Sequence, residues 1–239
     1  MKHLDRTWQT PAENLACDEA LLDWCEEEGG TEVLRLWEAR EHFVVLGYAN
    51  HATREVNLDA CRTRGIPVLR RCSGGGTVLQ GPGCLNYSLI LKMEGKKPLQ
   101  SISETNCYIM KRNAEAVAAV LGKSVAVEGF TDLAVNNLKF SGNAQRRKRD
   151  FLLFHGTFLL DYDSALMEEL LLLPARQPDY RQNRSHAGFL TRLDLPMDSI
   201  KAALKKSWAA TDPLGEIPNS DISRLVQEKY SREEWNLKW

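Results

Sequence analysis

Apolar side chains recur at helical intervals in two long segments. In residues 13–28 they alternate with acidic residues, and Gly29-Gly30, which can end a helix in left-handed geometry, follows. Residues 101–121 repeat the pattern, with Ser103 as the expected N-cap and Gly122 as the stop. Both segments are therefore predicted to be helices. Shorter helices are expected over 56–64 (ended by Gly65), 164–173 (ended by Pro174), 198–208 and 221–229.

Short runs rich in β-branched and aromatic residues predict strands. Residues 33–37 and 43–47 are separated by a polar turn, so we expect them to pair with each other. Further strands are expected over 66–71, 85–91, 125–128, 132–135, 138–141 and 151–160. Helices and strands alternate irregularly, without a series of βαβ units. The expected fold class is therefore α+β, with a mixed or antiparallel sheet flanked by helices.

Composition predicts one globular domain over residues 1–239, since 43% of the residues are hydrophobic and 26% charged. Lys and Arg number 31 and Asp and Glu 32, a balance that provides no overall field for nucleic acid or an anionic membrane. The basic cluster Arg146–Arg149 is expected to be a solvated loop tip, with an acidic partner protein as the alternative.

The six cysteines include no CxxC pair and no Cys/His metal spacing, which favours a reducing compartment. The first residues lack the apolar core of a signal peptide, and no apolar stretch approaches the roughly 20 residues needed to span a bilayer. We therefore expect a soluble cytoplasmic protein.

Ser73-Gly74-Gly75-Gly76 follows the predicted strand 66–71 and precedes the strand 85–91. Three glycines place no Cβ in the way, so backbone N–H groups can approach a bound anion, and Arg70 and Arg71 stand beside them. This pattern is typical of a phosphate or adenylate site, although a glycine run between strands is as often only a turn.

Asp132 and Lys139 lie seven residues apart on a predicted hairpin. An unbroken strand would point them to opposite faces, but a turn at Asn136-Asn137 can bring them together. Activation of a carboxylate by ATP uses such a pair: the carboxylate holds Mg²⁺, and the ammonium neutralises charge on phosphoryl and carbonyl oxygens. The alternative is a surface hairpin with an ordinary exposed lysine.

Five segments carry a resemblance in the same order as in a known family. They are Arg70–Val78, Leu85–Ser88, Asp132–Ala144, His155–Thr157 and Lys229–Asn236. Together they resemble the lipoate-protein ligase A family, within the superfamily of biotin and lipoate protein ligases and octanoyltransferases. The resemblance implies a class-II-synthetase-like α+β catalytic domain. From the resemblance we also expect a catalytic domain without the C-terminal accessory domain that many members carry, which leaves open whether a separate accessory subunit is needed.

The resemblance also implies a two-step reaction with ATP and Mg²⁺. Lipoate or octanoate becomes acyl-AMP, and a lysine of a lipoyl-domain acceptor, of the glycine cleavage H or dehydrogenase E2 type, then forms an amide. Lys139 would contact the acyl carbonyl and adenylate phosphate, and Asp132 would help hold Mg²⁺. His155 would lie near the lipoyl tail, or else be a hydrogen-bonded core histidine. The implied binding residues are Arg70, Ser73, Gly74, Gly75, Gly76, Val78, Leu79, Asn86, Ser141, Gly142 and His155, with backbone contacts to adenine from Val78 and Leu79.

Three segments depart from the family pattern. Residues 80–84 are similar to the His-Gly-Pro-Gly-Gln segment of octanoyltransferases. Thr131 stands where an asparagine normally precedes the aspartate, which leaves the second Mg²⁺ ligand open. Asn137-Leu138 replaces the glycine and its neighbour before the lysine.

Two other functions stay open. An octanoyl- or lipoyl-transferase with an acyl-carrier donor needs a cysteine thiolate in an electropositive pocket. No cysteine follows Cys107, and Cys72 and Cys84 beside the glycine loop are more typical of packed cysteines. A non-catalytic relative would only bind a lipoyl protein, but the complete glycine loop and Lys139 argue against decay of the site.

Overall fold

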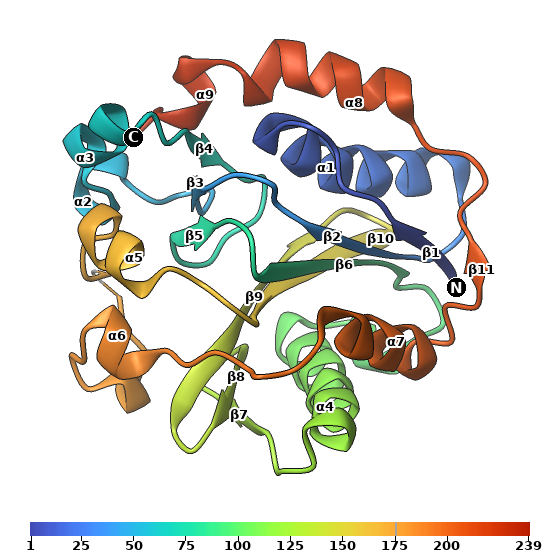
Figure 1. Ribbon diagram of the computed structural model, residues 1–239. Coiled ribbons are helices and arrows are strands. Elements are labelled where there is room, and N and C mark those ends of the chain that lie inside the picture. The colour runs from blue at the N-terminus through green and yellow to red at the C-terminus, as the bar shows by residue number, and fades with distance from the viewer. Residues whose placement is uncertain (175) are drawn as a thin grey trace.

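The computed structural model describes residues 1–174 and 176–239. Within them, eight strands form one sheet in the order β11-β1-β2-β6-β10-β9-β8-β7, and three form a smaller sheet in the order β4-β3-β5 (Figure 1). The large sheet is mixed: β1 runs parallel to β2 and β11, and the remaining pairs are antiparallel. The predicted α+β class is confirmed.

The strands of the large sheet are β1 (Lys2–Asp5), β2 (Val33–Glu38), β6 (Cys84–Lys92), β7 (Ala126–Glu128), β8 (Asp132–Val135), β9 (Leu138–Arg147), β10 (Phe151–Leu159) and β11 (Asp212–Pro213). Those of the small sheet are β3 (Phe43–Leu46), β4 (Val68–Arg70) and β5 (Val78–Gln80). The helices are α1 (Pro11–Glu28), α2 (Ala52–Glu55), α3 (Leu58–Arg64), α4 (Ile102–Leu121), α5 (Ser164–Leu170), α6 (His186–Phe189), α7 (Met197–Ser207), α8 (Asn219–Leu225) and α9 (Glu233–Asn236). Short helical turns cover Lys97–Leu99, Asp179–Arg181 and Val226–Tyr230.

Helix α1 covers one face of the large sheet, with α8 beside it (Figure 1). It starts two residues before the predicted position because Thr10 caps it. The Thr10 hydroxyl accepts the Glu13 N–H, and the Glu13 carboxylate accepts the Thr10 N–H in return. Gly29 ends the helix with φ 65°, as predicted. The buried face of α1 packs on Val33, Ile90 and Leu153 of the sheet.

Helices α4 and α7 cover the opposite face of the large sheet (Figure 1). The N-cap of α4 is Ser101 and not the predicted Ser103, because the Ser101 hydroxyl accepts the Glu104 N–H. Gly122 ends this helix with φ 68° as predicted. No helix within the described ranges is long and apolar enough to cross a membrane.

The predicted pairing of residues 33–37 with 43–47 is wrong. Strand β2 lies between β1 and β6 in the large sheet, whereas β3 lies between β4 and β5 in the small one. Neither β1 nor β5 was predicted, and each provides a neighbour that the local pattern could not show. The glycine loop follows β4 and precedes β6 as predicted, but it joins β4 directly to β5 within the small sheet, and β6 of the large sheet comes only after β5.

Two predicted helices are shorter than expected, for one reason. The helix predicted over 56–64 is α3 and begins only at Leu58, because Val56 is extended and forms a β-bridge with Leu171; the short helix α2 before it was not predicted. The same bridge ends α5 at Leu170, before Pro174 is reached. Long-range pairing therefore sets the start of α3 and also the end of α5, which the prediction had assigned to Pro174.

The basic cluster Arg146–Arg149 is not a solvated loop tip as predicted. Its first three residues are partly buried, and only the last is exposed. Arg146 pairs with Glu19 at 3.1 Å. Lys148 pairs with Asp23 at 2.6 Å. Both carboxylates belong to α1, so the cluster ties the end of β9 to the helix that covers the sheet.

Candidate functional site

A cavity of about 380 Å³ lies on the α1 face of the large sheet, beside the small sheet. Nine of the predicted site residues line it: Gly75, Gly76, Val78, Leu79, Asn86, Asp132, Lys139, Gly142 and His155. Four do not: Arg70, Ser73, Gly74 and Ser141. The lining also includes Arg71, which the sequence analysis placed beside the glycine loop, and Asp18, Gln80, Thr157, Phe130, Arg181 and His186, which it assigned to no site.

Lys139 and Asp132 meet in this cavity. The turn between β8 and β9 consists of Asn136 and Asn137, whose φ values of 51° and 60° give the left-handed geometry of a tight hairpin. Lys139 lies opposite Ala134, which shares a face with Asp132, so both side chains project to one side. The Lys139 Nζ atom lies 2.8 Å from Asp132 Oδ1. The predicted approach of the two groups through the turn is confirmed.

Gly142 makes room for the Lys139 ammonium. A Cβ atom at this position would lie 2.9 Å from Lys139 Nζ and 3.0 Å from its Cε, a separation that real contacts hardly ever show. The Tyr180 hydroxyl donates to the other oxygen of Asp132 at 2.8 Å. Burial, together with the charge of Asp132, raises the pKa of Tyr180, so its hydroxyl stays protonated and donates. Both carboxylate oxygens of Asp132 are thus engaged.

The glycine loop turns its carbonyl groups toward Arg71. Arg71 donates to the carbonyls of Gly74 (2.5 Å) and Gly76 (2.8 Å). Among the described residues, none accepts a hydrogen bond from the N–H groups of Gly74, Gly75 or Gly76, and all three are exposed. Burial lowers the pKa of Arg71 to about 10, so its guanidinium remains charged at neutral pH. The loop therefore offers N–H groups, with a cation behind it, to an anion.

Arg70, which was expected to line the pocket, points elsewhere. Its Nη1 atom donates to the carbonyls of Gly47 (2.9 Å), Tyr48 (3.1 Å) and Asn50 (2.7 Å). These bonds brace the segment after β3, and the position in the cavity belongs to Arg71. Successive residues of an extended chain point to opposite sides, so only one of the two neighbouring arginines can face the cavity, and it is Arg71.

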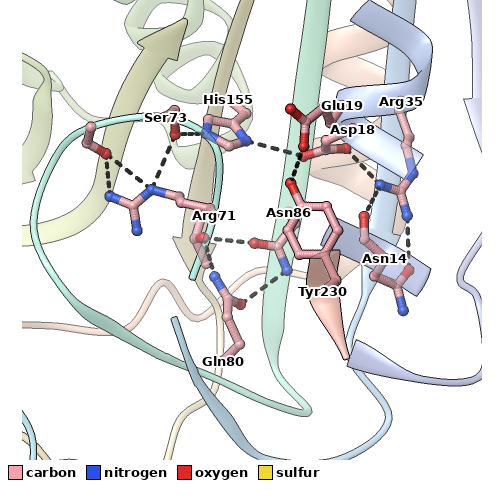
Figure 2. A network of polar contacts seen from close by, with 12 residues as sticks. Asn14, Asp18, Glu19, Arg35, Arg71, Ser73, Gln80, Asn86, His155 and Tyr230 are labelled. Carbon is pink, nitrogen blue, oxygen red and sulfur yellow. Dashed lines mark hydrogen bonds and ion pairs between the residues drawn. The ribbon is translucent and has the colours of Figure 1, made fainter. Parts of the chain in front are cut away.

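A relay of polar contacts reaches from the glycine loop to α1 (Figure 2). The Ser73 hydroxyl lies 2.5 Å from His155 Nε2, and His155 Nδ1 lies 3.0 Å from Asp18 Oδ2. Asp18 Oδ1 pairs with Arg35 at 2.6 Å, and both of these side chains are buried. His155 is therefore hydrogen-bonded and a wall of the cavity at the same time.

Asp18 is ionised in this relay. Burial alone would raise its pKa, but the charge of Arg35 and the hydrogen bond from His155 outweigh that effect and hold the pKa below its ordinary value. The sequence reasoning overlooked Asp18. The available signal was an acidic residue on the apolar face of a helix, where charges are rarely placed without a partner.

The opposite wall comes from the segment around α6 and the turn before β8. Arg181 Nη2 lies 3.4 Å from His186 Nδ1, and both residues are buried beside the cavity. Burial lowers the pKa of both groups. Phe130 is 87% exposed at the cavity mouth, an unusual position for a large apolar ring. No motif in the sequence marked these residues.

The cysteines near the glycine loop do not enter the cavity. Cys72 and Cys84 are buried, and burial raises the pKa of each thiol to about 12. The part of the cavity wall that the structure describes contains no cysteine. The thiols near the loop are therefore protonated at neutral pH and turned away from the site.

Curated proteins similar to this chain carry two kinds of name. The octanoyltransferase LipM of Geobacillus kaustophilus is 25% identical over 272 residues, covering 99% of this chain and 98% of that protein. The lipoate-protein ligase A subunit 1 of Thermoplasma acidophilum is 26% identical, covering 94% and 91% of the two chains. Thus the relatives include both transferases and ligases.

Solved structures share the fold. The bipartite lipoate protein ligase of Thermoplasma acidophilum, studied with its E2 lipoyl domain, superimposes with a TM-score of 0.82 at 23% identity, over 99% of this chain and 96% of that one. A lipoate-protein ligase A bound with ATP gives 0.82 at 22% identity, over 99% of both chains. Residues 10–212 match the catalytic domain of lipoyl protein ligases A and B, and the chain therefore belongs to the lipoyl protein ligase A/B catalytic domain family.

Proposed function

We propose that this protein is an ATP-dependent lipoate-protein ligase. In the first step the carboxylate of lipoate or octanoate attacks the α-phosphorus of ATP, giving acyl-AMP and pyrophosphate. In the second step a lysine amine of an acceptor protein attacks the acyl carbonyl, giving an amide and AMP. One observation carries the proposal: the Lys139 ammonium and the residues Gly75 and Gly76, whose N–H groups have no partner among the described residues, line one cavity whose described wall contains no cysteine.

The distances within the site support this reading. A Cβ atom at Gly75 would lie 3.3 Å from the Cβ of Ala144, and Lys139 Nζ lies above Gly142, two residues earlier on β9. The glycine loop and the ammonium therefore approach the same short stretch of one strand. Negative charge that develops on phosphoryl and carbonyl oxygens there meets N–H dipoles and two cations, Lys139 and Arg71, that are already in place.

The nucleotide would enter as its magnesium complex. Mg²⁺ that is bound mainly by phosphates needs only one or two protein carboxylates, and Asp132 is a suitable oxygen ligand. The residues of the described ranges hold no group of three metal-ligating side chains, and Thr131 uses its hydroxyl to donate to the carbonyl of Asn143 (2.8 Å). Asp132 would have to exchange its contact with Tyr180 or Lys139 for the ion.

The acceptor would be a small lipoyl domain, of the dehydrogenase E2 or glycine cleavage H type. Support comes from the structural neighbour, which was studied with its E2 lipoyl domain. A relative carries the name of subunit 1 of a ligase, so a separate accessory subunit is part of the proposal to be tested. The six free cysteines support a reducing, cytoplasmic setting.

An octanoyltransferase is the second candidate, and the likeness to LipM favours it. Such an enzyme needs a thiolate nucleophile within reach of the acyl group. The buried, protonated thiols of Cys72 and Cys84 do not offer one.

Mass spectrometry of a lipoyl domain tests the two candidates directly. The purified protein is incubated with the domain, MgATP and lipoate, or with the domain and an octanoyl-carrier protein without ATP. We expect acylation in the first mixture only, and no product when Lys139→Met replaces the wild type. Acylation from the carrier without ATP would overturn the ligase assignment. If the first mixture needs a second polypeptide from the same source, the accessory subunit is required.

A further inference from the structure

Three side chains in the cavity form a closed ring of hydrogen bonds. Gln80 Nε2 donates to Thr157 Oγ1 at 2.7 Å, and Thr157 Oγ1 donates to Asn86 Oδ1 at 2.7 Å. Asn86 Nδ2 completes the ring by donating to Gln80 Oε1 at 3.0 Å. Gln80 and Asn86 are buried, and all three residues line the cavity. Figure 2 shows Gln80 and Asn86 facing each other.

The ring lies where an acyl chain from Lys139 would run. Gly142, beneath the Lys139 ammonium, pairs across the sheet with Thr157, and Thr157 pairs with Asn86. Neighbouring strands lie about 4.8 Å apart, so Gly142 and Asn86 are separated by roughly 10 Å along this row. Seven carbon–carbon bonds of about 1.5 Å each span at most about 10 Å. An eight-carbon chain whose carbonyl is at Lys139 therefore ends over the ring.

The ring is built from polar side chains, but its bonding is directed inward. The hydroxyl proton of Thr157 goes to Asn86, and its oxygen accepts from Gln80. The second hydrogen of the Asn86 amide goes to the carbonyl of Cys84 at 3.2 Å. Each polar atom of the ring thus already has a partner within the protein, so a buried hydroxyl on the end of the chain would gain at best a second, shared hydrogen bond in exchange for those that it loses to water. Such burial is unfavourable.

We propose that the ring of Gln80, Asn86 and Thr157 is a specificity element that selects an acyl chain without a hydrogen-bonding group at its far end. This inference rests on the proposed function for the direction in which the chain runs. It also predicts that opening the ring creates a place for a hydroxyl. Without the Thr157 hydroxyl, Gln80 Nε2 and Asn86 Oδ1 would lose their partners, and a hydroxyl on the substrate would satisfy both.

The experiment compares octanoate with 8-hydroxyoctanoate as substrates of the ATP-dependent acylation. For the wild type we expect kcat/KM to favour octanoate by about tenfold or more. In Thr157→Val the preference should fall by about tenfold, because octanoate now leaves two polar groups unpaired while the hydroxylated acid pairs with them. Thr157→Ser keeps the hydroxyl and should retain the wild-type preference for octanoate.

Gln80→Met opens the ring at another of its three members and should also lower the preference for octanoate. This variant provides a second test if Thr157→Val does not fold.

Thr105→Val is the matched control. Thr105 is buried in α4, outside the cavity lining, and its hydroxyl oxygen accepts from Arg147 at 3.1 Å. Loss of this buried hydroxyl should lower stability without changing the preference between the two acids. An unchanged preference in both folded ring variants would overturn the specificity element.

Calorimetric titration of octanoate and 8-hydroxyoctanoate, without ATP, tests the specificity element separately from the proposed ligase function. If the wild type shows no ATP-dependent acylation but the ring variants still shift the ratio of the two dissociation constants, the proposed function fails and the specificity element stands. If acylation is robust and neither ratio changes, the specificity element fails and the function stands.

Discussion

The Nε2 atom of His155 lies 2.5 Å from the hydroxyl oxygen of Ser73, and this contact determines which atom donates in each hydrogen bond from Ser73 through His155 to Asp18. Arg71 also approaches the Ser73 oxygen, at 3.1 Å, and a guanidinium can only donate. We therefore assign the Ser73 proton to the bond with His155, which places the imidazole proton on Nδ1, facing Asp18 (3.0 Å). Through this relay, Asp18 in α1 holds the start of the glycine loop.

Asp18→Asn should reverse the tautomer of His155. An asparagine that accepts from Arg35 must present its NH₂ group to His155, so the imidazole proton moves to Nε2 and the Ser73 proton loses its acceptor. Nitrogen-15 NMR of the imidazole, assigned with His155→Gln, reports the tautomer. We expect kcat/KM for ATP to fall by about tenfold to a hundredfold. Asp23→Asn, in the same helix but outside the relay, should change neither reading, and an unchanged tautomer in Asp18→Asn would refute the assigned relay.

The low pKa of Asp18 predicts a defined acid sensitivity. Because the folded-state pKa lies below the ordinary value of 3.8, ionised Asp18 stabilises the fold above that pH. The contribution is lost as the pH falls from 3.8 through the folded pKa. Urea unfolding across this range should show that the stability difference between the wild type and Asp18→Asn shrinks as the solution becomes more acidic. A difference that stays constant with pH would mean that Asp18 is not ionised in the native protein.

Elements defined by local signals were predictable from the sequence. Helix α1 shows apolar periodicity and a glycine stop, and the αL glycine that ends α4 was equally visible. Elements defined by remote partners were not. Strand β1 contains only four residues and exists because it pairs with β2 and β11. The break between α2 and α3 depends on a bridge from Val56 to Leu171, more than a hundred positions away.

In the site, too, the contacts made within one hairpin were predictable and those made between distant elements were not. Lys139 and Asp132 were predictable because a two-residue turn joins them within one hairpin. The exchange of Arg70 for Arg71 was not, since nothing local shows which of two neighbouring side chains faces the cavity. Asp18 meets His155 from an element far along the chain, so only the assembled sheet places the two together.

Lys139→Met should abolish activation of the acid. The substitution keeps the aliphatic stem but removes the charge that lies beside Asp132 in the cavity. Loss of one such preorganised electrostatic contact costs about a hundredfold to a thousandfold in kcat. Lipoate-dependent exchange of pyrophosphate into ATP measures the first step in isolation. Lys201→Met removes a comparable lysine, paired with Asp5 at the surface (2.8 Å), and should leave the exchange rate intact. An undiminished rate of pyrophosphate exchange in Lys139→Met would show that Lys139 takes no part in activation of the acid.

Gly142→Ala should impair the same step without removing any charge. The new methyl group would lie 2.9 Å from Lys139 Nζ, so the ammonium must move away from its position. Displacement of a positioned group by about 1 Å can cost about a hundredfold in rate. Gly30→Ala is the control, because its methyl group would meet only an ordinary contact with Cys25 at 3.6 Å. A normal exchange rate in folded Gly142→Ala would show that the position of the ammonium is not critical.

The double variant Cys72→Ala/Cys84→Ala separates ligase from transferase at the level of the nucleophile. Both thiols are buried, with pKa values raised to about 12, so neither provides a thiolate at neutral pH. Alanine replaces a small apolar side chain in each case, and we expect ATP-dependent acylation to stay within about threefold of the wild type if the fold is kept. Cys107→Ala, at an exposed position on α4, controls for thiol loss in general. Complete loss of acylation in a variant with a normal circular dichroism spectrum would instead assign a covalent role to one of these sulfurs. In that case the thiol would take the acyl group from acyl-AMP, with AMP as the leaving group, and the acceptor lysine would attack the resulting thioester and release the thiol.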